Sequence, residues 1–475
     1  MHTTRMGLVT PRCAGLTVVD QASASGRTFG WLPRTRIWPT IEGVSADWHE
    51  IPGPAPTPPN GNLDDIAAAG GLHTFQLDLH ERHGPVARFE LPNARVVSVA
   101  DPELLAATSM INQRPQELFE FLSPLFEAGN LQTIGEAEHV PWRRLLLSAL
   151  GNHRSHEAHF DAFTRMTLEL ADRWAAQTGE VALQEDLSEL SLRLICEYAL
   201  GGDLGSSRRT SAAFRDLIAE YVARQYGLPS ALGAEGAAEA LAYVRETVTQ
   251  VLNSRPRGSG LMGMLAESGW DPARIRDTVL VVVMAGYHTS GVAVSWALHL
   301  LAGHPEIAGR LRDEVDGVLG DRPAPSYDDL KALDYLDRVV KESMRRYPPG
   351  PYAARELAQD TEIGGYRVQA GTTLMYPIWA IHLNPAQWPD PERFDPDRFT
   401  PAASERRAKF AFIPFGFGPR SCEGAALAMA EIKLVVAVLV KRFEFTPVPG
   451  HVVTPVERFV LWARDDIRMT LTSRG

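Results

Sequence analysis

A cysteine among glycines offers the first site for chemistry in this chain. Cys422 lies within residues 415–424, which read Phe-Gly-Phe-Gly-Pro-Arg-Ser-Cys-Glu-Gly and precede a predicted helix over 425–443. The free N–H groups and partial positive charge at a helix N-terminus lower a cysteine pKa and favour the thiolate, the form that ligates metals. Arg420 offers a cation to a cofactor carboxylate. Three glycines would let a flat cofactor approach the backbone closely: Gly416, Gly418 and Gly424.

The other two cysteines, Cys13 and Cys196, lack such neighbours. Cys196 lies in an apolar helical run over 192–200 and is predicted to be a buried core residue. Three scattered cysteines provide neither a disulfide framework nor a Cys-x-x-Cys pair, and they are too few for an iron–sulfur cluster. We therefore expect a reducing, cytoplasmic location.

The charge balance excludes one broad class of function. The 475 residues include 58 acidic and 47 basic side chains, which gives a formal net charge of −11, and 45% of the residues are apolar. This composition is typical of a globular protein. No face or tail concentrates Lys and Arg, so the sequence does not predict a nucleic-acid binder.

A long apolar helix is expected to cross the middle of the domain. Asp271 and Pro272 form a helix start, with an acidic cap followed by a proline in the first turn. The helix is predicted to run to about Leu301, before a glycine and a His-Pro breaker. Its longest uninterrupted apolar run, residues 279–287, is shorter than the roughly 20 residues that a bilayer requires. We expect a buried helix and no membrane anchor.

The remaining pattern predicts a protein that is mainly α with small β-sheets, an α+β class. Strands are expected over 86–91 and 95–100, joined as a hairpin, and over 362–368 and 372–378. The region from 102 to about 346 is predicted to be helical, and the C-terminus to be a final hairpin.

The chain is predicted to hold one domain after a leader. Residues 1–50 are dotted with arginines and rich in Gly, Pro and Thr, and are expected to be a disordered leader. Alternating prolines over 51–59 predict an extended arm. Residues 51–475 are predicted to form the single domain.

Residues 415–424 resemble the haem-binding loop of the cytochrome P450 superfamily, whose pattern is Phe-x-x-Gly-x-Arg-x-Cys-x-Gly. Every fixed position matches, at Phe415, Gly418, Arg420, Cys422 and Gly424. The resemblance extends from about residue 52 to the C-terminus. It implies the P450 fold with its long central helix, haem b as the cofactor, Cys422 as the iron ligand, and a soluble enzyme of bacterial type.

A second motif of that family concerns structure. Alone, a Glu and an Arg three residues apart on a helix form an exposed salt bridge worth a few tenths of a kcal/mol. Glu342-Ser-Met-Arg345 resembles the family's buried Glu-x-x-Arg pair. Together with Arg398 from residues 396–399, the resemblance implies a structural triad that holds the loop before the cysteine.

Further matches concern the cofactor's propionates. His139 and Arg143 resemble the histidine and arginine that contact haem propionates in the family, and Arg355 matches a third contact. With Arg420 they would provide four cations for one dicarboxylate cofactor.

Residues 285–290 resemble the family's oxygen-activating segment. A small residue there, Ala285 or Gly286, opens a groove for dioxygen, and the threonine, Thr289, steers protons. His288 stands where the family usually has an acid. Either His288 packs within the core, or its imidazole replaces the carboxylate as a proton relay. Sterol 14α-demethylases carry the same His-Thr pair, so C–C bond cleavage of that kind is an alternative.

The resemblance implies a haem-thiolate monooxygenase that hydroxylates or otherwise oxidises an apolar or amphipathic small molecule, such as a terpenoid, steroid, fatty acid or other secondary metabolite. Oxidative coupling, rearrangement or peroxide-driven oxidation are alternatives, as is a non-catalytic haem sensor or carrier. The side chains predicted to line the substrate pocket are aromatic, aliphatic or small: Phe121, Ala285, Gly286, Tyr352, Ala353, Phe459 and Val460.

Electrons are expected from a separate protein, because the haem domain takes up the chain. NAD(P)H would act only indirectly, through a ferredoxin or flavodoxin with its reductase. Basic side chains near the thiolate side predict a docking patch for such an acidic partner: Arg143, Arg144, Arg406, Arg407, Lys409 and Arg420.

Overall fold

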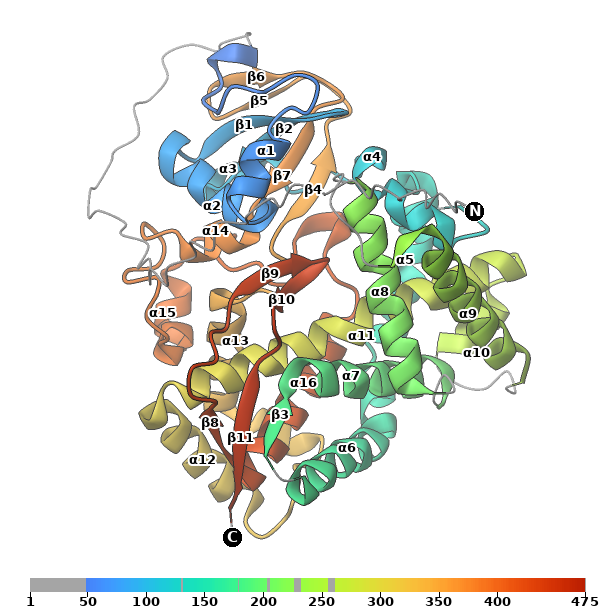
Figure 1. Cartoon of the computed structure of the whole chain (residues 1–475), viewed down its shortest axis with the longest axis vertical. Coiled ribbons are helices and arrows are strands. Elements are labelled where there is room, and N and C mark those ends of the chain that lie inside the picture. The colour runs from blue at the N-terminus through green and yellow to red at the C-terminus, as the bar shows by residue number, and fades with distance from the viewer. Residues whose placement is uncertain are drawn as a thin grey trace, which may run out of the picture. The chain divides into compact units, whose positions relative to one another are not determined.

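Helix α11 (Pro272–Ala302) runs through the middle of the fold in this computed structural model (Figure 1). The Asp271 carboxylate caps the helix by accepting a hydrogen bond from the Ala273 backbone N–H at 2.8 Å. The predicted helix over 271–301 is confirmed. The structure describes residues 48–129, 131–177, 179–202, 206–225, 232–254 and 261–474.

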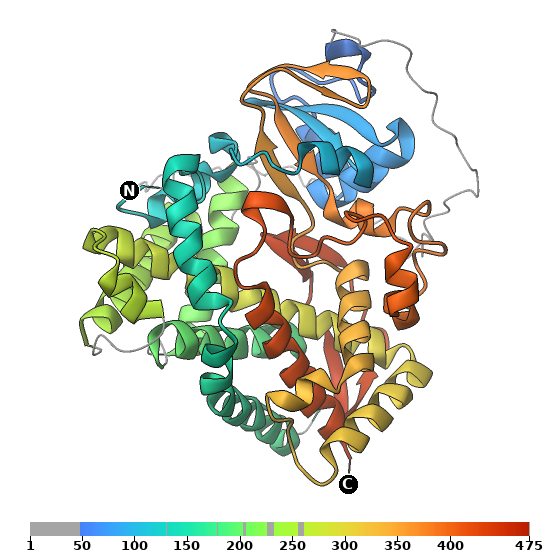
Figure 2. The ribbon, with the colours of Figure 1, turned by 180° about the vertical axis from the view of Figure 1, so that it is seen from behind.

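Neighbouring helices enclose α11. Among the described helices, α11 is the one long and apolar enough to span a membrane, and 83% of its most apolar window is buried inside the protein. It packs against α7 (Leu183–Leu200), α13 (Asp334–Arg346) and α16 (Ala425–Arg442). Seen from behind, α16 in dark red crosses the same central region, in contact with α13 and with α6 (His153–Ala176) (Figure 2).

Two glycines bring α7 and α11 unusually close together. A Cβ atom on Gly291 would lie 2.5 Å from the Leu187 carbonyl oxygen, and one on Gly286 would lie 2.6 Å from the Ile195 side chain. Both distances are shorter than van der Waals contact. Any larger residue at either position would push the two helices apart.

The other helices surround this centre and confirm the mainly α prediction. The α-helices are α1 (Leu63–Ala68), α2 (Leu72–His83), α3 (Pro102–Thr108), α4 (Gln116–Phe119), α5 (Glu136–Leu150), α8 (Ser207–Gln225), α9 (Gly233–Ser254), α10 (Leu261–Glu267), α12 (Pro305–Leu319), α14 (Ile378–Leu383) and α15 (Pro401–Glu405). The 3-10 helices are η1 (Trp48–Glu50), η2 (Glu120–Leu125), η3 (Asp328–Lys331), η4 (Pro396–Phe399) and η5 (Gly418–Arg420).

Short strands form small sheets beside the helices. A four-stranded sheet has the order β1-β2-β7-β4, in which β2 and β7 are parallel and the other pairs antiparallel. A three-stranded antiparallel sheet has the order β3-β11-β8, and β5–β6 and β9–β10 form hairpins. The strands are β1 (Val86–Leu91), β2 (Ala94–Val99), β3 (Glu180–Ala182), β4 (Ala353–Glu356), β5 (Thr361–Ile363), β6 (Tyr366–Val368), β7 (Thr373–Tyr376), β8 (Phe443–Pro447), β9 (Pro455–Arg458), β10 (Val460–Ala463) and β11 (Arg468–Ser473).

The strand predictions are confirmed in part. The hairpin of β1 and β2 forms as expected, with Val86 paired to Val99. The predicted strand over 362–368 is instead two strands, because Gly364 and Gly365 adopt positive φ angles of 59° and 85° and turn the chain. The region from 102 to 346 also contains a strand, β3, which pairs with β11 from the far end of the chain.

The proline-rich segment packs on the sheet and does not project as an arm. Ile51 is buried, and the Pro52 carbonyl accepts a hydrogen bond from the Arg88 N–H of β1 at 2.7 Å. Trp48, inside the predicted leader, donates from its indole N–H to the Glu90 carboxylate at 2.9 Å. These residues belong to one unit with the rest of the chain to its end. The leader before Trp48 lies outside the described residues.

Candidate functional site

The cysteine loop is held by backbone contacts. The Cys422 N–H donates to the Phe415 carbonyl at 2.8 Å, and α16 begins three residues later at Ala425, as predicted. Gly418 has a φ of 64°, and a Cβ atom there would lie 1.9 Å from the Ser109 carbonyl oxygen. Gly418 is therefore required by the approach of Ser109; its predicted role beside a cofactor stays a prediction.

The Cys422 thiol does not ionise readily in this structure. The side chain faces a cavity but is enclosed by protein around it, and this burial raises the pKa of the thiol to about 11. The neighbouring Glu423 carboxylate raises the pKa further, whereas the Gly424 N–H lowers it. The expected lowering of the thiol pKa by the helix start is thus outweighed by desolvation. A cation bound at the sulfur would reverse the balance.

The cavity in front of Cys422 has a volume of about 360 Å³ and brings together most of the predicted site. Its walls come from α5, α11, α16, the cysteine loop and the segment before β4. The predicted residues that line it are His139, Ala285, Gly286, Thr289, Tyr352, Ala353, Phe415, Gly416, Arg420, Cys422, Gly424 and Phe459.

Other predicted residues are absent from that lining. Val460 is buried in the apolar core beside the cavity. Arg143, Arg355 and His288 lie behind the walls, as described below. The side chain of Phe121 lies outside the described residues.

One end of the cavity gathers basic side chains. His139 is buried, and the pKa of its imidazole is lowered to about 3 by burial and by nearby arginines, Arg420 first among them. Burial, together with Arg114, lowers the pKa of Arg420 and of Arg355 to about 9 each. The Arg114 guanidinium is itself buried, with its pKa lowered to about 10. We call these four residues the cation cluster.

The hydrogen bonds of the cation cluster leave its charge uncompensated. Arg420 donates to the backbone carbonyls of Asn112 and Ile134 at 2.8 and 2.7 Å, and Arg355 donates to the carbonyl of Ala354 at 2.7 Å. Three buried nitrogens of the cluster have no hydrogen-bond partner: Arg114 Nε, His139 Nδ1 and Arg355 Nε. The Glu423 carboxylate acts on Arg114 and Arg420, but it is already paired with Arg143. Buried cations with so little negative charge beside them are expensive, so this end of the cavity suits an anionic ligand with more than one carboxylate.

Arg143 serves the other side of the cysteine loop in this structure. Its guanidinium donates to the Ser421 carbonyl at 2.6 Å and to the Ser421 hydroxyl at 2.8 Å, and it pairs with Glu423. Arg143 therefore braces the two neighbours of Cys422. Its predicted contact with a cofactor carboxylate stays a prediction.

The groove side of α11 is partly as expected. Ala285 is exposed to the cavity, and the Thr289 hydroxyl donates to the Ala285 carbonyl at 2.9 Å. The space that Gly286 leaves open is filled by Ile195 of α7. The groove is therefore made by Ala285 and Thr289, with Gly286 allowing the close contact between helices.

His288 points away from the cavity. It is buried, and its ring meets the Trp462 ring edge-on with centroids 5.0 Å apart. It lines a separate small pocket with Ser188 and Arg215, and burial holds the pKa of its imidazole well below 6.5. This placement matches the core-packing interpretation of His288; its role as a proton relay stays a prediction.

Sequence reasoning missed two candidate functional residues. Arg114 stands in an ordinary stretch, Asn-Gln-Arg-Pro, with no motif spacing to mark it. Glu431 lies on α16, lines the cavity, and accepts a hydrogen bond from the Ser290 hydroxyl at 2.9 Å. Its burial raises the pKa of the carboxyl to about 8, and its Oε1 has no partner. Glu431 follows Cys422 by nine residues on an apolar helix, which was the available signal.

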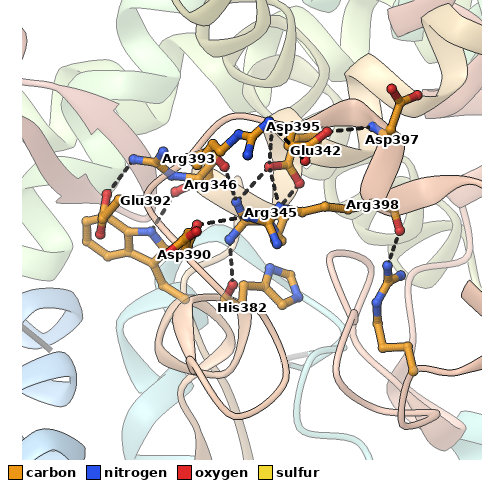
Figure 3. Close-up of polar contacts among 12 residues, drawn as sticks. Glu342, Arg345, Arg346, His382, Asp390, Glu392, Arg393, Asp395, Asp397 and Arg398 are labelled. Carbon is orange, nitrogen blue, oxygen red and sulfur yellow. Dashed lines mark hydrogen bonds and ion pairs between the residues drawn. The ribbon is translucent and has the colours of Figure 1, made fainter. Parts of the chain in front are cut away.

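The expected structural triad of Glu342, Arg345 and Arg398 is assembled at the end of α13 (Figure 3). The side chains of Glu342 and Arg345 are fully buried and joined by two hydrogen bonds of 2.7 Å. Arg345 also donates to the His382 carbonyl at 3.0 Å, and Arg398 Nε lies 3.6 Å from Glu342 Oε1. The Glu342 carboxylate accepts the Asp395 N–H at 2.9 Å as well. The triad therefore fixes the irregular chain around 382–398 to α13.

Comparison with known proteins identifies the family. The family model described as "Cytochrome P450" matches residues 51–227 and 247–470. The chain is 36% identical over 220 residues to cyclooctat-9-en-7-ol 5-monooxygenase of Streptomyces melanosporofaciens, a match that covers 44% of this chain and 48% of that protein. It is 43% identical over 168 residues to thromboxane-A synthase of Mus musculus, covering 35% and 32%.

A longer match has lower identity. Cytochrome P450 3A31 of Mesocricetus auratus is 26% identical over 435 residues, covering 84% of this chain and 85% of that protein. The stronger matches thus span less than half of the relatives' length, and the weaker match spans most of it.

The site fits the cofactor of that family. The Cys422 sulfur faces the cavity, as an iron ligand would. The cation cluster, with its unpartnered nitrogens, lies at one end of the cavity and suits the two propionates of haem b. Cys422 would ligate the iron, and His139, Arg420 and Arg114 would hold the propionates. The chain therefore belongs to the cytochrome P450 family, whose cofactor is haem b.

Proposed function

We propose that this protein is a monooxygenase that oxidises an apolar small molecule. One observation carries the proposal: a single cavity has the Cys422 sulfur in one wall and the Ala285–Thr289 groove of α11 in another. When bound, haem ligated by a thiolate supplies dioxygen activation, because the thiolate favours O–O cleavage. The chain's own residues provide the rest, because they bind and orient the substrate and hold or move protons.

Thr289 is the residue placed to hold a proton at the cavity. Its hydroxyl now donates to the Ala285 carbonyl within the helix. A rotation about χ1 would turn the same O–H toward the cavity, so the residue can switch between donor directions. Glu431 and Ser290 stand next to it and are shielded from bulk water.

The cavity walls support an apolar or amphipathic substrate. Leu122, Leu146, Val282 and Phe459 are among the side chains that face it, and pockets with few polar groups select ligands by shape and apolar contact. Matched relatives include a protein named for cyclooctat-9-en-7-ol and one named for taurochenodeoxycholic acid hydroxylation. We propose a terpenoid, steroid or fatty acid substrate for this chain.

An acidic redox partner, either a ferredoxin or a flavodoxin with its reductase, is proposed to dock on the thiolate side of the loop, in the cytoplasm. The predicted patch needs correction there. Arg420 is buried, and Arg407 is half-buried over the Trp388 ring, whereas Arg144, Arg406 and Lys409 are exposed. A groove of about 560 Å³ shares Pro414, Phe415 and Gly416 with the cavity wall and adds three lysines: Lys331, Lys341 and Lys433.

The test is the absorption spectrum of the dithionite-reduced protein with carbon monoxide, for wild type and Cys422→Ser. A strongly red-shifted Soret band that disappears in the variant is expected. A band typical of histidine-ligated haem, unchanged by the substitution, would overturn the assignment of Cys422. Product formed with peroxide and without an electron donor would favour peroxygenase chemistry over monooxygenation.

A further inference from the structure

His73, near the start of α2, is a buried histidine outside the machinery described above. It is 2% exposed, and its ring stacks on Trp379 of α14 with centroids 5.7 Å apart and planes inclined by 16°. Neither ring nitrogen has a hydrogen-bond partner. A Cβ atom on Gly71 would lie 2.8 Å from the ring, so this glycine leaves the room that the imidazole occupies. The ring is therefore fixed in place by packing.

The fixed imidazole faces a carboxylate from the opposite end of the chain. His73 Nδ1 lies 3.7 Å from Glu457 Oε2 of β9, and the two side chains are 0% and 10% exposed. The other carboxylate oxygen, Glu457 Oε1, accepts a hydrogen bond from the Tyr352 hydroxyl. One carboxylate thus joins α2, β9 and the residue that precedes β4.

Glu457 is connected to the cavity in two ways, through Tyr352 and along β9 to Phe459. Tyr352 lines the cavity directly. Phe459 also lines it, two residues after Glu457, at the turn where Arg458 pairs with Val460. Phe459 has a φ of 69°, in the left-handed region that an aromatic residue adopts only where its surroundings impose it. The turn that carries Phe459 is therefore under constraint.

The two strands of this hairpin are held by different means. On β10, the Leu461 carbonyl accepts the Trp296 indole N–H at 2.8 Å, and the Leu461 N–H donates to Pro349 at 2.9 Å. On β9, Glu457 provides the contacts to Tyr352 and His73. The conformation of the turn depends on both strands being held.

We infer that His73, Glu457 and Tyr352 form a polar clamp that positions Phe459 in the cavity wall and thereby determines which ligand shapes bind. The residues of the clamp are positioning residues; Phe459 is the one that contacts the ligand. The inference rests on the proposed function, because it takes the cavity to be the ligand site. A rigid apolar wall binds a large ligand better than a loose one, since less order is lost on binding.

The experiment compares two ligands that coordinate haem iron through nitrogen, imidazole and the bulkier 4-phenylimidazole. Their dissociation constants are measured from the Soret shift of the holoenzyme. In Glu457→Gln and in Tyr352→Phe, 4-phenylimidazole is expected to bind about tenfold more weakly, a change within the range of couplings between contacting residues. Imidazole is expected to stay within about twofold, because it does not reach the wall.

Two further variants make the test specific. In a Phe459→Ala background, Glu457→Gln is expected to have no further effect on 4-phenylimidazole binding, because the residue it positions is gone. Glu362→Gln, on the exposed edge hairpin of β5, is the matched control and should bind both azoles like wild type. Tyr352→Phe removes a single oxygen atom, so it remains informative if other variants load haem poorly.

Three results would overturn the clamp. One is an unchanged ratio of the two dissociation constants in both clamp variants, even with a lowered melting temperature, which would leave only a structural role. Another is an equal loss in the Phe459→Ala background. A wild type that loads haem but binds neither azole would contradict the proposed ligand site itself, and with it the clamp.

Discussion

The Glu342–Arg345–Arg398 triad and the cation cluster are both buried groups of charge, but they differ in how that charge is balanced. In the triad, Glu342 accepts hydrogen bonds from Arg345 and from the Asp395 backbone. In the cation cluster, arginines donate to backbone carbonyls, and three nitrogens lack partners. The triad contains its own carboxylate and leaves one buried nitrogen, Arg398 Nε, without a hydrogen-bond partner, whereas the cation cluster has no carboxylate among its members and leaves three.

Burial lowers the pKa of Arg398 in the triad as well, but the large shifts lie in the cation cluster. Burial and neighbouring arginines depress the pKa of His139 to about 3, so this residue is uncharged in the cavity without an anion. The unpartnered nitrogens and shifted pKa values of the cation cluster therefore indicate a binding site more strongly than the presence of basic residues alone.

The largest expected effect comes from breaking the Glu342–Arg345–Arg398 triad. Glu342→Ala leaves the Arg345 guanidinium buried without its carboxylate, and the free energy of unfolding should fall by about 3–5 kcal/mol. Denaturant titration of the haem-loaded protein measures the loss. Lys341→Met, on the adjacent and more exposed pair with Asp337, is the control and should change stability by less than about 1 kcal/mol. Similar losses for both variants would contradict the distinction.

A single buried acid should give an effect on stability that depends on pH. The pKa of Glu431 is raised by burial from 4.5 to about 8. Below pH 4.5 both folded and unfolded states are neutral, and its contribution to stability is fully present. Between pH 4.5 and 8 the unfolded state ionises while the folded state stays protonated, so stability is lost as pH rises. Glu431→Gln should remove this loss and raise the relative stability at pH 9 by up to about 5 kcal/mol, at about 1.4 kcal/mol for each pKa unit. Melting temperatures measured from pH 5 to 9 test this, and parallel curves for the two proteins would contradict it.

The smallest expected effect comes from removing one arginine of the cation cluster. Arg114→Met removes a cation that shares Glu423 with Arg143 and Arg420 in the protein and would gain a carboxylate of its own from bound haem. Haem should be lost to excess apomyoglobin about tenfold faster, equivalent to about 1.4 kcal/mol, with little change in the stability of the chain itself. Arg144→Met, on the exposed side of α5, is the control. Equal rates in both variants would remove Arg114 from the cofactor site.

Sequence reasoning succeeded where local rules act alone. The cap at Asp271 and the turn before β2 depend on near neighbours, so α11 and the first hairpin could be predicted. The cysteine loop could be found because its motif is contiguous. Arg114 could not, because its role arises from Arg420 and His139 approaching it from distant segments. Desolvation, which raises the pKa of the Cys422 thiol without a bound cation, depends on surrounding walls that no local pattern describes. The predicted thiolate stays a prediction.

The glycines at 286 and 291 have a mechanical consequence. With the backbone of α7 against Gly291 and Ile195 against Gly286, the two helices cannot slide or separate without a steric clash or a void. The two helices therefore form one rigid wall of the cavity. A ligand larger than the cavity in this structure must therefore displace other walls, such as the turn that carries Phe459. The α7–α11 pair meanwhile holds Thr289 in a fixed position in the cavity wall.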